Sequence, residues 1–320
     1  MDATGHGRHR NAALPGACNI GSAAEPPDSS YVFQTREDIF DTATRTTIQW
    51  NDSPPTPGVS MPNAGHRAGA VSHIVCAGCR QGDTFYPQSE FSASSDPLQR
   101  GGMDRFSDYG DPKLRLYTAD GQVIPQTSDK YIGVYATFKL PPDQADYRLT
   151  HRLERTDPAA PSVSTAWEFT SHGVVDDDET PEPYECVGTL LEGLADGPPS
   201  NTPCRPEPLI FLRYNLGLDL SNRAKAPGVH RFEVTAYRQP STADRPDIAG
   251  LKLWVSDDGG DNWREALVRT LGDGRFEATV VYRPAHQRTS DTISIKAMAW
   301  DTAGNRVEQT IERAYTLTER

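Results

Sequence analysis

The feature that most constrains the fold is a period-two alternation of apolar and polar residues that recurs through residues 208–317. Successive side chains of a β-strand point to opposite faces, so each run places its apolar residues on one face. The apolar residues of the four clearest runs are Phe232, Val234 and Ala236; Leu251, Leu253 and Val255; Phe276, Ala278 and Val280; and Ile293, Ile295, Ala297 and Ala299. Turn residues separate these runs at short spacing. The pattern therefore predicts two sheets packed face to face, a β-sandwich.

The end of the chain leaves two interpretations open. Val307, Ile311 and Tyr315 are four residues apart and would line one face of a helix. Thr310 and Thr316 accompany them, and β-branched and aromatic residues favour strands. We therefore predict a final strand.

Residues 74–171 carry the same kind of pattern. Leu114 and Leu116 alternate with less apolar neighbours, and Asp120-Gly121 then predicts a hairpin whose second strand contains Val123. Further short strands are predicted at residues 131–140, 147–150 and 165–170. No helical stripe of convincing length is present. The expected fold class is all-β, with two β-sandwich modules.

Composition and turn residues divide the chain into four parts. They are an irregular N-terminal segment and linker at 1–73, a β-sandwich module at 74–173, an acidic and proline-rich linker at 174–207, and a second β-sandwich at 208–320. Within the first part, residues 31–50 are expected to hold one or two strands. The run from Asp176 to Glu179 marks the third part, because such dense like charges repel one another and extend the chain.

The sequence SDDGGDNW, at residues 256–263, matches an Asp-box, S-x-D-x-G-x-(T/N)-W. The matching residues are Ser256, Asp258, Gly260, Asn262 and Trp263. We expect the carboxylate to accept backbone N–H groups of the loop, Gly260 to adopt a positive φ and Trp263 to pack over the hairpin. In sialidase-like propellers the box recurs once per blade, and a propeller needs repeats. The single copy here therefore predicts a structural turn, with a glycan site as the alternative.

The sequence WDTAGN, at residues 300–305, resembles the turn before the last strand of many bacterial fibronectin-like and immunoglobulin-like modules. Asp301 and Asn305 suit such a turn, and Gly304 supplies the unusual φ. The resemblance implies that the C-terminal module is fibronectin type III-like or immunoglobulin-like.

Oxygen-rich turns are also what calcium binds, so calcium at Asp301, or at Asp257, Asp258 and Asp261, is a second interpretation. The twelve-residue EF-hand spacing is absent, and we predict no metal site and no cofactor.

Four of the five cysteines fall into local pairs that are candidate disulfides. Cys186 and Cys204 flank a loop rich in Gly, Pro and Asp, and Cys76 and Cys79 form a C-x-x-C. Zinc, with His66 and His73 as further ligands, and a redox dithiol are the alternatives for the C-x-x-C. Two disulfides would place the protein in an oxidising compartment.

No catalytic residue is predicted. The chain contains no G-x-S-x-G elbow and neither of the subtilisin sequences HGTH and GTSMAxP. The eight histidines are each expected to lie at the surface or to serve in packing.

The net charge of −12 argues against nucleic acid and anionic membranes as partners. The longest apolar run, residues 209–212, is too short to span a bilayer. The first residues contain no apolar stretch of a secretory signal. The missing signal would be compatible with disulfides if the chain were the tail of a longer secreted protein. The excess of arginine over lysine, with abundant Ala, Gly and Pro, is typical of a GC-rich genome.

From Cys76 onward the chain resembles the region C-terminal to the peptidase domain in actinobacterial subtilisin-like (S8) serine peptidases. The segments that carry the resemblance are CAGCRQGDTFYP, DYRLTHRLER, VSTAWEFTS, PLIFLRYNLGLDLSNRAKAPGVHRFEVTAYRQ, LKLWVSDDGGDNWREA and SIKAMAWDTAGNRVEQTIERAY. The peptidase domain, with its Asp, His and Ser, is missing, so no catalytic residue can be transferred. The resemblance implies export, β-rich accessory modules and association with a peptidase.

Three functions follow as hypotheses. The favoured one is a non-catalytic accessory region of a secreted subtilisin-like peptidase, encoded separately or left by a truncated gene, with the peptidase or a cell-surface polymer as partner. The second is a secreted module that binds glycan or cell wall, which requires Trp254, Trp263 or Trp300 to line a groove. The third is an enzyme of unfamiliar type, which requires a pocket holding a histidine, a carboxylate and a nucleophile.

Overall fold

The computed structural model describes residues 7–13, 16–24, 32–40, 44–50, 53–59, 74–76, 78–87, 90–92, 95, 114–128, 137–153, 161–174, 184–186, 203–219, 221–241 and 245–319. Their regular structure is β except for one 3₁₀ turn, η1 (Ala285–Gln287). The strands form several mostly antiparallel sheets, which confirms the all-β prediction. None of the helical structure in this described part is long enough to cross a membrane.

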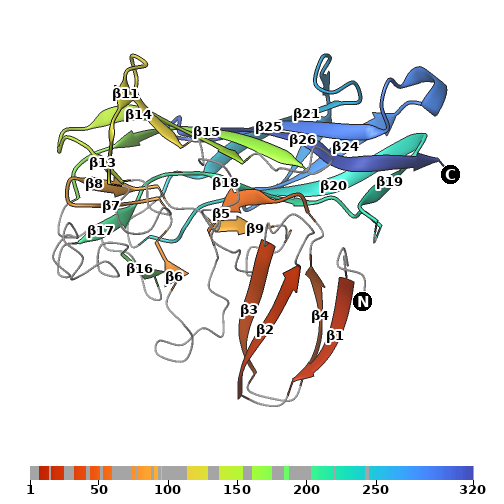
Figure 1. Cartoon of the computed structure of the whole chain (residues 1–320), viewed down its shortest axis with the longest axis horizontal. Helices are drawn as coiled ribbons and strands as arrows, with labels where there is room; N and C mark the ends of the chain where they lie inside the picture. Colours follow the sequence, from red (N-terminus) through yellow and green to blue (C-terminus); the bar gives the residue numbers. More distant parts are fainter. Residues whose placement is uncertain are drawn as a thin grey trace.

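A nine-stranded sheet is the largest unit (Figure 1). In spatial order its strands are β11 (Val123–Ile124), β10 (Arg115–Thr118), β14 (Ala145–Leu153), β15 (Ser162–Ser171), β26 (Arg306–Glu319), β25 (Thr292–Asp301), β21 (Ile248–Ser256) and β22 (Arg264–Glu265), and β19 (Arg223–Ala226) pairs parallel with β26. The hairpin predicted at Asp120-Gly121 is present, because β10 and β11 pair antiparallel around it.

Two smaller sheets lie beside the large one. The first has the order β18 (Phe211–Asn215), β20 (Gly228–Tyr237), β24 (Arg275–Tyr282) and β23 (Leu267–Gly272). The second has the order β12 (Gln126–Ser128), β13 (Thr137–Lys139), β8 (Thr84–Tyr86), β7 (Cys79–Gln81) and β17 (Cys204–Pro206). Four strand pairs complete the described structure: β1 (Gly7–Ala13) with β4 (Thr44–Trp50), β2 (Gly16–Ala24) with β3 (Val32–Phe40), β5 (Thr56–Gly58) with β9 (Glu90–Ser92), and β6 (Ile74–Val75) with β16 (Tyr184–Glu185).

The core lies between the nine-stranded sheet and the sheet of β18, β20 and β24, which run as two layers in Figure 1. It extends to the five-stranded sheet, where Phe85 of β8 meets Phe169 of β15 at 5.7 Å. Trp167 of β15 spans both layers: its ring meets Phe211 of β18 at 6.0 Å, and its Nε1 donates to the carbonyl of Ile210 at 2.7 Å. The Tyr214 hydroxyl of β18 donates to Gln309 of β26 at 2.9 Å. Every apolar residue assigned above to the four period-two runs is buried.

The final segment is a strand, as predicted, and not a helix. Val307, Ile311 and Tyr315 lie in β26 with exposed fractions of 0–1%. All three side chains are buried and therefore face the core.

The pairing of β15 with β26 joins the two predicted modules. The register runs from Ser162 opposite Glu312 to Glu168 opposite Arg306. Strands from residues 74–173 and from 208–320 therefore belong to one continuous sheet. The division of the chain into domains stays a prediction.

The structure differs from the sequence prediction in the N-terminal part. Residues 1–30 were expected to be irregular, but β1 and β2 are strands there and pair with β4 and β3. The strands expected within 31–50 are present as β3 and β4. Backbone hydrogen bonds between paired strands need no apolar periodicity, which is why sequence pattern missed β1 and β2.

The proline-rich stretch 53–59 is buried along its whole length, where a linker was expected. Thr56 Oγ1 donates to the carbonyl of Leu212 at 3.1 Å, and the Val59 carbonyl accepts from the Tyr237 hydroxyl at 3.0 Å. Proline and glycine mark breaks in local structure, but they do not exclude packing against other strands. The acidic run 176–179 and residues 131–136 lie outside the described residues.

Candidate functional site: a groove on the nine-stranded sheet

Hydrogen bonds to the Asp258 carboxylate hold the Asp-box turn together. Asp258 Oδ1 accepts from the Ser256 hydroxyl at 2.7 Å and from the Asn262 backbone N–H at 2.9 Å, and its Oδ2 accepts from Asn262 Nδ2 at 2.8 Å. Ser256 Oγ also accepts from the Gly260 N–H at 2.9 Å, and Gly260 has a φ of +101°. These bonds lower the pKa of Asp258 to about 2, chiefly through Ser256. The carboxylate is thus used within the turn.

Asp301 plays the same part in the second turn. Its Oδ1 accepts from the backbone N–H groups of Ala303 at 2.8 Å and Asn305 at 2.9 Å, and its Oδ2 pairs closely with Arg238. Asn305 Oδ1 accepts from the Thr170 N–H at 3.1 Å, so the turn is also tied to β15. Gly304 has a φ of +91°.

Among the described residues no three or more His, Cys, Asp or Glu side chains are placed to hold a metal ion. His66 and His73, the further zinc ligands considered above, lie outside the described residues.

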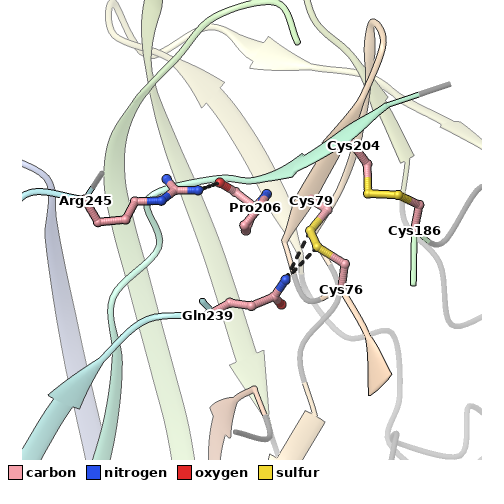
Figure 2. The surroundings of a disulfide bond; sticks show 7 residues. All are labelled: Cys76, Cys79, Cys186, Cys204, Pro206, Gln239 and Arg245. Carbon is pink, nitrogen blue, oxygen red and sulfur yellow. Dashed lines mark hydrogen bonds between the residues drawn. A yellow bond between two sulfur atoms is a disulfide. The ribbon is translucent and has the colours of Figure 1, made fainter. Parts of the chain in front are cut away.

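Both cysteine pairs lie at disulfide distance, with Cα–Cα separations of 5.7 Å for Cys76 and Cys79 and 6.0 Å for Cys186 and Cys204. Figure 2 shows the amide of Gln239 directed at the first pair, where its Nε2 lies 2.7 Å from Cys76 Sγ. The two pairs are neighbours, because β17, which begins at Cys204, pairs with β7, which begins at Cys79. The oxidised state of the thiols stays a prediction.

A buried polar cluster surrounds Glu207. Its Oε1 accepts from the Ser171 hydroxyl at 2.7 Å and lies 3.4 Å from Arg205 Nη2, and Arg80 Nη1 donates to Ser171 Oγ at 3.0 Å. Burial of the Glu207 carboxyl group is the main reason that its pKa is raised. Ser171 is fully buried. The cluster ties β15, β17 and β7 together, and the nearby His172 ring contacts Arg205 and not Ser171.

The outward face of the nine-stranded sheet carries a groove of about 600 Å³. It is lined by Arg115, Tyr117, Arg148, Thr150, His151, Arg152, Ser164, Thr165, Ala166, Trp254, Lys296, Ala297, Met298, Glu308 and Thr310. These residues come from β10, β14, β15, β26, β25 and β21, so the groove crosses the strands. It also crosses the β15–β26 boundary between the two predicted modules.

The strand registers arrange the outward residues in rows. One row runs Trp254, Lys296, Thr310, Ser164, Arg152, and the next runs Lys252, Met298, Glu308, Ala166, Thr150, Arg115. The middle of the groove therefore holds the small side chains of Thr310, Ser164 and Ala166 beside the carboxylate of Glu308, and long side chains lie at its two sides. Adjacent strands are about 4.8 Å apart, so the first row spans roughly 19 Å. An extended ligand fits such a surface better than a compact one.

A glycan site would need at least one of the three tryptophans in a groove, and Trp254 lines this one and is partly exposed. Trp263 lies under Lys296, whose Nζ is 4.4 Å from the ring centre. Trp300 packs flat on Gly250, where an added Cβ would lie 2.3 Å from the ring. The sequence offered the three rings as alternatives, and Trp254 is the one that lines the groove.

His151 borders the groove from within the core. It is buried on the inner face of β14, and burial lowers its pKa to about 4. It is therefore neutral at neutral pH and adds no charge to the groove. The charges of the groove come from exposed arginines, one lysine and Glu308.

Sequence reasoning missed the basic and small residues of this site. Arg115, Arg152, Ser164 and Thr310 each occupy a polar position in an alternating run and look like an ordinary solvated face. Only the order of the strands brings them together.

No protein-family model matches the chain, and no curated protein matches it. The resemblance to the accessory region of S8 peptidases therefore stays a prediction.

Proposed function

We propose that this chain is a non-catalytic module of an extracellular protein and that it binds a polysaccharide across the outward face of its nine-stranded sheet. The single observation that carries the proposal is the position of Trp254, partly exposed at one side of a groove with small residues in its middle. Aromatic rings bury much area at little entropic cost, which suits them to stack on sugar rings.

The rest of the site supports an extended ligand. Tyr117 lies on β10 and Trp254 on β21, on opposite sides of the groove. The small side chains of Thr310, Ser164 and Ala166 leave room for a chain of sugars, and Thr310 and Ser164 offer hydroxyl groups for hydrogen bonds. The groove thus combines apolar surface from its aromatic rings with a few polar groups, as ligand sites do.

The finer fold assignment belongs to the same proposal. We infer two β-sandwich modules that share a sheet, the C-terminal one fibronectin type III-like or immunoglobulin-like. Secretion and the accessory role beside a subtilisin-like peptidase are compatible with a polymer-binding module, which would hold the peptidase near a cell surface. DNA upstream of Met1 that codes in frame for a peptidase core would support this role, and a separate signal sequence without such a core would count against it.

Binding is tested with Trp254→Ala and Trp254→Phe. Each variant is run beside wild type through gels that contain neutral and acidic polysaccharides, and affinity is taken from the retardation. Loss of the ring is expected to weaken binding at least about tenfold, and the phenylalanine variant should keep most of it. Leu267→Ala, at an exposed apolar residue on β23 of the other sheet, is the matched control. Equal retardation of wild type and Trp254→Ala on every polymer would refute the proposal.

A further inference from the structure

A row of three polar side chains crosses the core on the inner face of the nine-stranded sheet. His151 of β14 lies opposite Thr165 of β15, and Thr165 lies opposite Gln309 of β26. The three residues are only 7%, 3% and 2% exposed. The row continues into Ala297 and Leu253, so its surroundings are apolar. Threonine and glutamine are mostly surface residues, and side chains with their chemistry need a reason to lie this deep.

The hydroxyl group of Thr165 and the carboxamide of Gln309 are in direct contact. Gln309 Nε2 donates to Thr165 Oγ1 at 3.0 Å. The amide carbon Cδ is bonded to this nitrogen, so a turn of the carboxamide brings Cδ to the hydroxyl oxygen without movement of the backbone. Two reacting groups held together in this way need no encounter in solution, which removes much of the entropic barrier to their reaction.

The carbonyl group of Gln309 has a hydrogen-bond donor at its oxygen. The Tyr214 hydroxyl of β18 donates to Gln309 Oε1 at 2.9 Å. Burial raises the pKa of Tyr214, so the phenol keeps its proton and stays a donor. A donor at this position stabilises the negative charge that develops on the oxygen when a nucleophile attacks the carbonyl carbon, as an oxyanion hole does.

His151 supplies a base beside the hydroxyl group. Residues directly opposite each other on antiparallel strands have Cβ atoms about 4.5–5.5 Å apart, so the imidazole and the Thr165 hydroxyl lie side by side. Burial lowers the pKa of His151 to about 4, so the ring is neutral and able to take up a proton. Such a weak base gives a slow reaction, but a reaction that happens once in the life of a chain needs no fast turnover.

We propose that Thr165 and Gln309 join in an intramolecular ester bond. Thr165 Oγ1 attacks Gln309 Cδ, His151 takes the hydroxyl proton, and the Tyr214 hydroxyl stabilises the oxyanion on Oε1. The proton then passes from His151 to the amide nitrogen, the C–N bond breaks and ammonia leaves. The Oγ1–Cδ bond thus replaces the Cδ–Nε2 bond without any oxidant or further reactant, and dilution of the ammonia into solvent prevents the reverse reaction.

The bond would join the two predicted modules covalently. Thr165 and Gln309 are 144 positions apart in the chain and lie on β15 and β26, the strands at which the modules meet. A crosslink that closes so long a loop restricts the unfolded chain strongly. The bond lies in the core and needs no ligand, so its test is independent of the test of polysaccharide binding.

The intact mass of the full chain, measured after reduction of its disulfides, tests the bond. Wild type is expected to be lighter than its sequence by the mass of one ammonia, and proteolysis should yield a linked pair of peptides that contain Thr165 and Gln309. Hydroxylamine, which cleaves esters and spares ordinary amides, should separate the pair. A wild-type chain with its full sequence mass would overturn the inference.

Thr165→Val removes the nucleophile and should keep the full sequence mass, whereas Thr165→Ser should still form the bond. Thr170→Val is the matched control, because Thr170 lies on the same strand and contacts Asp146, and this variant should lose ammonia as wild type does. Loss of ammonia from Thr165→Val as well would point to another source, such as a succinimide, and would overturn the ester.

His151→Gln and Tyr214→Phe test the base and the oxyanion donor. In a time course after cell-free synthesis, each variant should form the linked chain about tenfold or more slowly than wild type. Thermal unfolding shows that the variants are folded during the time course. Unchanged rates in both folded variants would overturn the roles given to His151 and Tyr214.

Discussion

A single buried histidine makes the stability of this protein depend on pH. His151 lies between Leu149 and Leu153 on the inner face of β14, and burial lowers its pKa to about 4 from an ordinary value of 6.5. The unfolded chain therefore binds a proton more readily than the folded one between these values. The stabilisation is complete above pH 6.5 and falls as the pH drops towards 4, by about 3 kcal/mol in all.

We expect the free energy of unfolding in urea to fall between pH 7 and pH 4.5, and His151→Gln to remove most of that slope. Glu207 contributes in the opposite sense: its raised pKa stabilises the folded state at low pH, and this stabilisation is lost as the pH rises. The comparison of the two chains cancels this contribution, because both contain Glu207. The same slope in both chains would show that His151 is not its source.

At the residue scale the sequence predicted turn chemistry well. Asp258 and Gly260 act within the Asp-box as their types indicate, because a short aspartate side chain readily accepts from backbone N–H groups of its own loop. The sequence could not predict that Trp263 packs on Lys296 or that Trp254 lines a groove, since both contacts depend on the order of the strands.

At the scale of elements, the β23–β24 turn offers a matched pair of glycines. Gly272 and Gly274 both have positive φ, at +95° and +70°. A Cβ on Gly272 meets nothing within 4 Å, whereas one on Gly274 would lie 2.2 Å from the carbonyl oxygen of Ala236. Gly272→Ala should cost about 1–2 kcal/mol of folding free energy, through backbone strain alone.

Gly274→Ala should cost about 3 kcal/mol or more, because steric overlap with β20 adds to the strain. Chemical denaturation of both variants measures the difference. Equal costs would mean that the turn shifts freely away from β20.

The Cys186–Cys204 pair should stabilise the edge strand β17. It closes a loop with a sequence separation of 18, against 3 for Cys76 and Cys79. In the chain-entropy picture, replacing both Cys186 and Cys204 by serine should lower the free energy of unfolding by about 3 kcal/mol. Replacing both Cys76 and Cys79 by serine should lower the free energy of unfolding by less, because these two residues close a shorter loop. A thiol titration of the native chain accompanies the measurement, and four reactive thiols from the paired positions would contradict both disulfides.

For the whole molecule, the shared sheet predicts cooperative unfolding. β15 pairs with β26 from Ser162 opposite Glu312 to Glu168 opposite Arg306, and Trp167 packs across the layers on Phe211. Disrupting either predicted module exposes the edge of the other, so residues 114–319 should melt together. Calorimetry is expected to show one transition with equal calorimetric and van't Hoff enthalpies. Two separated transitions would instead indicate two independent modules.

The sequence by itself determined which side chains face inward. Leu253, Phe276 and Ile295 are buried because period-two alternation is a local property of a strand, and the burial of apolar area enforces it at each position. Only the tertiary structure decided which strands are neighbours. The pairing of β15 with β26 brings Arg152 and Trp254 onto one surface, although they lie in different predicted modules. Outward residues are not selected by burial, so no local pattern reveals the groove that they form together.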